Sequence, residues 1–161
     1  MTDKIKIGLI FGGNSSEYEV SIMSAHNIYE EIDTNKFDVY PMWITNDGYL
    51  ADDADSRKVL DNPKMEVANP HKVANISNII ELKDRPEIDV FFPIVHGNLG
   101  EDGCLQGLFR VLDKPFVGDD VLAAAVTMDK EMTKILAQRA GVPVAKWIAV
   151  KRFEYNDPDN E

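Results

Sequence analysis

The residues that could do chemistry lie mainly in two glycine-rich loops. The first loop, GGNSSEYEVS at residues 12–21, carries Glu17 and Glu19 shortly after a glycine pair. A glycine pair between an apolar strand and a helix is typical of a phosphate site, where backbone N–H groups at the helix N-terminus bind the anion. Because a carboxylate in such a site would repel phosphate, this loop either binds nothing or binds a ligand that is partly cationic.

The second loop, HGNLGEDGCLQG at residues 96–107, begins with His96 and follows the apolar run IDVFFPIV. Glu17 follows the apolar run KIKIGLIF in the same way. Both residues therefore come just after a predicted strand. Since open α/β sheets place their ligands at the carboxyl ends of the strands, we expect a ligand site at this edge of the sheet.

The elements that must hold these loops follow an α/β pattern. Apolar runs at residues 4–11, 37–44 and 88–95 predict buried strands, and the spacing from Val20 to Ile32 predicts a helix between the first two. This strand, helix, strand order is a βαβ unit. We therefore predict a three-layer α/β domain with a mostly parallel sheet.

The remaining segments carry weaker patterns. Residues 50–85 are polar and aperiodic, which predicts an insertion over the surface. On the predicted helix from Val20 to Ile32, Ser21 is expected to face water. Asp129 is expected to cap a separate helix near the C-terminus. Other expected elements are a hairpin at 42–51, a short helix at 104–112, strands at 114–118 and 145–150, helical segments from 119 onward, and a buried helix face formed by Val20, Met23, Ile28 and Ile32.

Composition narrows the class of partner. The 161 residues are 44% hydrophobic and 28% charged, which is typical of a globular chain with one full domain or one domain and the start of another. The formal net charge of −11, with no cluster of Lys or Arg, argues against nucleic acid and against anionic membranes. The single cysteine, Cys104, cannot form an internal disulfide, and no apolar stretch near the N-terminus is long enough to export or anchor the chain, so we expect a cytoplasmic protein.

Three motifs carry a family resemblance: GGNSSEYEVS, HGNLGEDGCLQG and MDKEMTK, in this order and at these separations. Together they resemble the N-terminal region of the D-alanine–D-alanine ligases of the ATP-grasp superfamily. The resemblance implies an ATP-dependent ligase that phosphorylates one D-alanine to an acyl phosphate and joins it to a second, for peptidoglycan. It implies a pre-ATP-grasp domain over residues 1–118 and the start of an ATP-grasp domain over 119–161.

The resemblance also assigns roles to single positions. Glu17 matches the glutamate that acts in the catalytic site by pairing with the ammonium of the first D-alanine. Val20 matches a residue lining the same subsite, and the helix N-terminus at Val20 and Ser21 would suit the substrate carboxylate. His96 matches a histidine that faces the same substrate, and Lys130 matches a lysine that contacts the phosphates of ATP. An amino-acid zwitterion would explain why the first loop is acidic.

The resemblance further implies that ATP and Mg²⁺ are the cofactors and that D-alanine and ATP are the small-molecule partners, with a homodimer as the plausible assembly. The family's metal carboxylates and most of its ATP-grasp core lie C-terminal to the residues present here, so we expect no metal site in this chain and no ligase turnover by the chain alone. Glu101 and Asp102 match the family's second loop, where we expect them to hold its shape by hydrogen bonds. Departures from the common family pattern at Tyr18, Phe116 and Ala124 affect details of fit.

Other interpretations stay open. Glu17 could simply cap the helix that it precedes, and His96 could be satisfied by loop carbonyl groups. The chain could be a non-catalytic α/β module that keeps only the amino-acid half-site. A dinucleotide-binding Rossmann domain is disfavoured because GGNSSE lacks the G-x-G-x-x-G pattern. Cys104 is expected to pack as a small apolar side chain, and His26 and His71 have no partner at metal spacing.

Overall fold

The computed structural model describes residues 3–75 and 87–151. One five-stranded sheet contains three parallel strands that lie side by side: β1 (Ile5–Gly12), β2 (Phe37–Ile44) and β5 (Val90–Pro93). Strand β1 lies between the other two and pairs with both in parallel. The predicted α/β class, the three strands and their parallel pairing are confirmed.

Two short antiparallel strands complete the sheet, whose order is β4-β3-β2-β1-β5. Strand β3 (Tyr49–Ala51) returns along β2 as the predicted hairpin, and β4 (Lys72–Asn75) pairs with β3. The sheet is therefore parallel through its long strands and antiparallel at one edge. Both β4 and β5 occupy edges, which leaves β1 as the most enclosed strand.

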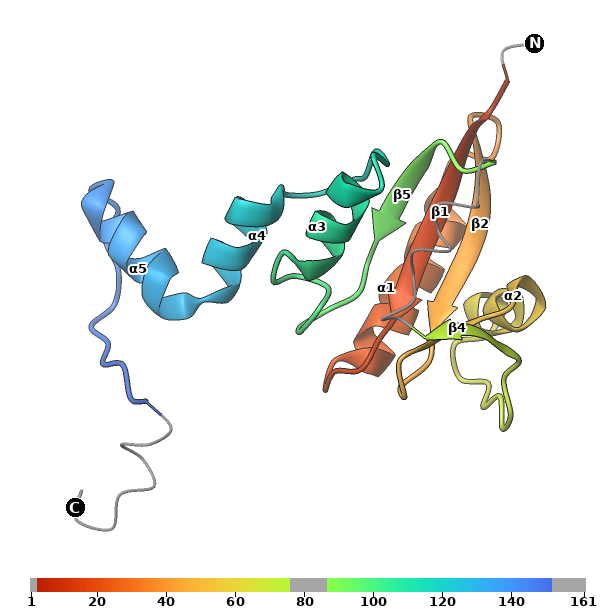
Figure 1. Cartoon of the computed structure of the whole chain (residues 1–161), viewed down its shortest axis with the longest axis horizontal. Helices are drawn as coiled ribbons and strands as arrows, with labels where there is room; N and C mark the ends of the chain where they lie inside the picture. The colour runs from red at the N-terminus through yellow and green to blue at the C-terminus, as the bar shows by residue number, and fades with distance from the viewer. Residues whose placement is uncertain (1–2, 76–86, 152–161) are drawn as a thin grey trace.

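Helices cover both faces of the sheet and give three layers (Figure 1). Helix α1 (Tyr18–Glu31) and helix α2 (Asp53–Asp61) pack on one face, where Leu9 and Phe11 belong to the buried cluster. Helix α3 (Cys104–Val111) covers the other face, and its core cluster includes Ile10. Because side chains alternate along β1, the same strand supplies both cores.

The α3 layer contains a stack of aromatic rings. Phe91 of β5 and Phe109 of α3 lie with ring centroids 5.1 Å apart and nearly parallel, and both side chains are fully buried. Phe116 extends the stack at 5.4 Å from Phe109. These contacts hold the helix that follows the second glycine-rich loop against the strand that precedes it.

Two expectations for residues 3–75 were wrong, and the rest of the expected insertion, residues 76–85, lies outside the described residues. Residues 53–61 form α2 rather than irregular chain, because Val59 and Leu60 find a buried place against the sheet and Asp52 accepts a capping hydrogen bond from the Asp55 amide. The buried face of α1 is also shifted: Val20 and Met23 are 53% and 42% exposed, while Ser21 is fully buried. Ser21 can be buried because its hydroxyl pairs with the backbone of two strands.

The C-terminal part of the described chain leaves the sheet (Figure 1). Helix α4 (Val121–Met128) buries Ala124, and helix α5 (Lys130–Arg139) buries none of its residues. Asp129 caps α5 as predicted, by accepting hydrogen bonds from the amides of residues 131 and 132. The strand expected at 145–150 does not form, because no strand in residues 3–75 or 87–151 pairs with this segment. The strand expected at 114–118 is reduced to one parallel bridge from Phe116 to Phe91.

None of the helices in the described ranges is long and apolar enough to cross a membrane.

Candidate functional site

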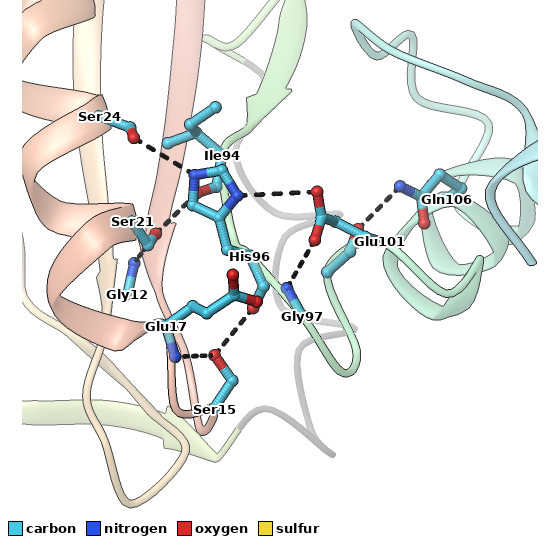
Figure 2. Close-up of polar contacts among 11 residues, drawn as sticks. Gly12, Ser15, Glu17, Ser21, Ser24, Ile94, His96, Gly97, Glu101 and Gln106 are labelled. Carbon is cyan, nitrogen blue, oxygen red and sulfur yellow. Dashed lines mark hydrogen bonds and ion pairs between the residues drawn. The ribbon is translucent and has the colours of Figure 1, made fainter. Parts of the chain in front are cut away.

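The two glycine-rich loops lie side by side at the carboxyl ends of β1 and β5 (Figure 2). This follows from the parallel pairing, in which Ile10 of β1 is opposite Pro93 of β5. The Ile94 amide continues the pairing by donating to the Ile10 carbonyl at 2.8 Å. The two loops therefore meet at the edge of the sheet where a site is expected, although they are about 80 residues apart in sequence.

Ser21 connects the first loop to both strands. Its buried hydroxyl accepts a hydrogen bond from the Gly12 amide at 2.8 Å and donates one to the Ile94 carbonyl at 2.7 Å. Its own amide donates to the Glu17 carbonyl within the first turn of α1. Every polar group of Ser21 that could meet a ligand is thus engaged inside the fold, and its role in the structure is to anchor α1.

The glycine pair is not free to bind an anion. The Gly12 amide is used by Ser21, and the Gly13 amide donates to the Ile44 carbonyl at 2.9 Å. A phosphate cradle needs such amides to point at the ligand. The geometry therefore disfavours a dinucleotide site here, in agreement with the missing sequence pattern.

Glu17 precedes α1 in the N-cap position, yet within the described residues its side chain accepts no capping hydrogen bond. The carboxylate instead extends toward the second loop. A Cβ atom placed on Gly97 would lie 3.1 Å from Glu17 Oε2, and the Gly97 φ of +74° also favours glycine. The exposed carboxylate thus lies against a backbone that carries no side chain and stays available to a ligand.

His96 lies between α1 and the second loop (Figure 2). Its Nε2 is 3.3 Å from the Ser24 hydroxyl, and its Nδ1 is 3.6 Å from Glu101 Oε1. The imidazole is 25% exposed. With the proton on Nδ1, Nε2 accepts a hydrogen bond from the Ser24 hydroxyl, and the Nδ1–H edge faces the Glu101 carboxylate at a distance too long for a hydrogen bond. The hydrogen bond from Ser24 and the electrostatic attraction of Glu101 both favour this ring orientation.

The acidic residues of the second loop hold its shape by hydrogen bonds. Glu101 accepts from the Gly97 amide at 2.8 Å, and Asp102 accepts from the amides of Leu99 and Cys104 at 2.9 and 3.0 Å. Partial burial acts to raise the pKa of Asp102, but these hydrogen bonds outweigh it and keep that pKa below its ordinary value. The contacts expected of Glu101 and Asp102 are confirmed.

Cys104 differs from its expectation. The thiol is exposed at the start of α3 rather than packed as an apolar side chain. A hydrogen bond to Asp102 and partial burial raise the pKa of Cys104. A raised pKa disfavours the thiolate, so the position does not have the character of a reactive cysteine.

A cavity of about 210 Å³ lies between the end of β5 and α4. Its lining includes His96, Glu101, Gln106 and Ala124. The amide nitrogen of Gln106 donates to the Gly100 carbonyl at 2.9 Å, while its buried Oε1 has no hydrogen-bond partner among the described residues. This cavity, with polar and apolar side chains in its lining, is bordered by both His96 and Glu101.

Lys130 lies apart from these residues. It begins α5, is exposed, and its Nζ donates to the Thr127 carbonyl at 2.7 Å. Figure 1 places α5 beyond α3 and α4, away from β1 and α1. The structure therefore brings Glu17 and His96 together with Val20 at the start of α1, and it does not bring Lys130 to them.

The other histidines have structural contacts. His26 Nδ1 is 2.8 Å from the Leu60 carbonyl, and His71 Nδ1 is 3.3 Å from an Asp52 oxygen. Among residues 3–75 and 87–151 no three His, Cys, Asp or Glu side chains gather as metal ligands would.

The family follows from comparison with known proteins. The family model described as "D-ala D-ala ligase N-terminus" matches residues 6–119, which is most of the chain. The chain belongs to the D-alanine–D-alanine ligase family. The matched range includes both glycine-rich loops, which carry two of the three motifs of the resemblance.

Relatives in the D-alanine–D-alanine ligase family match the whole chain. A D-alanine–D-alanine ligase of Lactobacillus johnsonii is 99% identical over all 161 residues, and one of Lactobacillus acidophilus is 74% identical. The chain spans 45% of the length of each of these relatives. Their full length therefore includes more than the residues described here.

Solved structures of the family share the fold. The D-Ala:D-Ser ligase VanG of Enterococcus faecalis is 34% identical, with a TM-score of 0.70 over 95% of this chain and 47% of its own. The D-alanine–D-alanine ligase of Coxiella burnetii is 36% identical, with a TM-score of 0.70 over 90% of this chain and 44% of its own. That of Bacillus anthracis, complexed with ATP, is 26% identical, with a TM-score of 0.63 over 96% of this chain and 43% of its own.

Sequence reasoning missed three polar residues of this family member's site: Ser15, Ser24 and Gln106. Ser15 was detectable as a polar residue between the glycine pair and Glu17. Ser24 had no local signal, because its partner His96 lies 72 residues away. Gln106 looked like a surface residue of a short helix until the cavity beside it was known.

Proposed function

We propose that this chain is the N-terminal part of an ATP-dependent D-alanine–D-alanine ligase that makes D-alanyl-D-alanine for peptidoglycan. Residues 1–118 would be the pre-ATP-grasp domain that holds the first D-alanine, and residues 119–161 would begin the ATP-grasp domain. The observation that carries the proposal is the Glu17 carboxylate, which makes no capping bond in the described structure and lies against Gly97.

The electrostatics of the two loops support an ammonium ligand. Glu17 and Glu101 approach opposite sides of Gly97, one at its Cα and one at its amide. Neither loop contains Lys or Arg, so His96 is the one titratable base within them. A carboxylate-rich site with a helix N-terminus beside it suits a zwitterion, whose ammonium pairs with Glu17 and whose carboxylate is favoured by the positive end of α1.

In the proposed reaction, a carboxylate oxygen of the first D-alanine attacks the γ-phosphorus of ATP and ADP leaves. The amino group of the second D-alanine then attacks the acyl carbon and phosphate leaves. The residues of this chain bind and orient the first substrate: Glu17 holds the ammonium, Val20 borders the subsite, and His96 faces the substrate from a ring fixed by Ser24 and Glu101.

ATP and Mg²⁺ complete the proposal. Mg²⁺ would neutralise charge developing on the transferred phosphoryl group. Lys130 is exposed and could turn its ammonium from the Thr127 carbonyl to a phosphate, but the described residues offer no cluster of metal ligands. We therefore assign Mg²⁺ binding to the part of the full-length relatives that this chain does not span.

Location and assembly follow from the same proposal. The cytoplasm supplies ATP and keeps an exposed thiol such as Cys104 reduced. A homodimer is proposed for the full-length ligase. Sedimentation of the full-length relative at several concentrations tests it, and a monomer at all of them would contradict it.

A coupled ADP-release assay with D-alanine and Mg-ATP tests the function. We expect turnover by the full-length Lactobacillus johnsonii relative and none by the 161-residue chain alone. Turnover by the chain alone would show that the catalytic groups lie within it. ADP release by the full-length protein that does not depend on D-alanine would overturn the proposed function, and titration with NADH serves as the control for a dinucleotide site.

A further inference from the structure

Ser15 connects the backbones of the two residues that the proposed function uses most. Its hydroxyl accepts a hydrogen bond from the Glu17 amide at 3.1 Å and donates one to the His96 carbonyl at 2.9 Å (Figure 2). A serine hydroxyl has one proton to donate, and here it is committed to His96. The side chain is therefore a two-bond bridge between the loops.

The bridge fixes a close approach. A Cβ placed on Gly97 would be 3.2 Å from Ser15 Cβ and 3.1 Å from Glu17 Oε2, so these side chains occupy the space above the Gly97 backbone. The Ser15 hydroxyl links the two loops at this close approach. Their separation in turn sets where the Glu17 carboxylate lies relative to the His96 ring.

We propose that Ser15 is a positioning residue for the first-substrate half-site: its hydroxyl holds Glu17 and His96 at the spacing that binds the ammonium end of the substrate. This rests on the proposed function. Without the hydroxyl, the Glu17 amide and the His96 carbonyl lose their shared partner and the loops can separate. Part of the free energy of binding the first substrate is then spent on ordering the two loops.

The effect should be selective. Lys130, the residue assigned to ATP, lies on α5 and makes its hydrogen bond locally to Thr127. The hydrogen bonds of the Ser15 hydroxyl go instead to the backbones of Glu17 and His96. Loss of the Ser15 hydroxyl should therefore weaken binding of the first D-alanine and leave ATP binding unchanged, whereas general damage to the fold would affect both.

The experiment uses the full-length Lactobacillus johnsonii relative with Ser15→Ala, Ser15→Thr and Ser16→Ala at the matching positions. Ser16 is the control because it is the exposed neighbour in the same loop. For Ser15→Ala, which removes both hydrogen bonds of the bridge, we expect the KM for the first D-alanine to rise about tenfold or more, with the KM for ATP within about twofold of wild type. Ser15→Thr keeps the hydroxyl and should restore most of the affinity.

Amide hydrogen exchange provides a readout that needs no substrate. Ser15→Ala should speed exchange of the Glu17 amide, and Ser16→Ala should not. Unchanged exchange in Ser15→Ala would overturn the bridge, even if the wild-type protein proved not to be a ligase. Faster exchange with an unchanged KM for D-alanine, or an equal rise in both KM values together with a lower Tm, would overturn the positioning role.

Discussion

Replacing Glu17 by Gln separates a substrate-binding role from a capping role. Gln has nearly the same shape as Glu and removes the charge. Since the Glu17 side chain makes no capping hydrogen bond to α1 and is exposed, the substitution should leave the free energy of unfolding nearly unchanged. Any large effect should therefore appear in binding of the first substrate.

The size of that effect follows from the position of the carboxylate. Two unit charges 4 Å apart attract by about 1 kcal/mol in water and about 4 kcal/mol at the effective dielectric constant near a protein surface. Glu17 is exposed in the described chain, so a value between these limits applies. Exchanging a charge-assisted hydrogen bond for a neutral one then costs about 1.5–3 kcal/mol, or roughly 10- to 150-fold in affinity.

The assay is coupled ADP release by the full-length Lactobacillus johnsonii relative with D-alanine varied at saturating Mg-ATP. Glu19→Gln is the matched control, because Glu19 has the same side chain and lies in the first turn of the same helix. We expect Glu17→Gln to raise the KM for the first D-alanine and Glu19→Gln to leave it unchanged. If Glu17→Gln leaves the affinity for the first D-alanine unchanged, or if a lower Tm accounts for the lost affinity, then Glu17 acts only as a helix cap.

Three further substitutions test the surroundings of the site. Gly97→Ala should cost about 1–2 kcal/mol of stability because φ is positive there, and should also weaken D-alanine binding by displacing the Glu17 carboxylate; wild-type affinity would show that the close approach is unimportant. Ala124→Ser should raise the free energy of unfolding by about 1 kcal/mol if its hydroxyl reaches the unpaired Gln106 oxygen in their shared cavity, and an unchanged Tm would refute that contact. Because the pKa of Asp102 is lowered, its carboxylate stabilises the fold above about pH 4, and this stabilisation is lost as the pH falls through the lowered pKa. Asp102→Asn should therefore lower the Tm at pH 7 and reduce the drop in Tm between pH 7 and pH 3. Parallel plots of Tm against pH for the wild type and the variant would contradict this.

The α/β class and the positions of the long strands could be predicted because their signals are local. Residues 5–12 and 37–44 are short, mostly apolar runs that end at a glycine or before a turn, a pattern that is typical of buried strands. The hairpin at Asn46-Asp47-Gly48 and the Asp129 cap also depend on residues next to one another. Each of these features was confirmed.

The expectations that were wrong depended on distant partners. Ser21 was expected in water but is buried because the Ile94 carbonyl and the Gly12 amide meet it there. The polar segment at 53–61 forms a helix because its few apolar side chains, Val59 and Leu60, pack against the sheet. The run at 145–150 had the composition of a strand, yet in the described structure it has no neighbour with which to form a ladder.

The sequence by itself determined which residues could bind a substrate, since Glu17 and His96 stand in loops that directly follow buried strands. Only the tertiary structure decided how they act together. The parallel register of β1 and β5 brings two loops about 80 residues apart to the same edge of the sheet, and there Ser15, Ser24 and Gly97 fix the spacing of the two side chains. Hydrogen bonds and close approaches of this kind depend on positions in space to within a few tenths of an ångström, and residue type and spacing along the chain do not specify such positions.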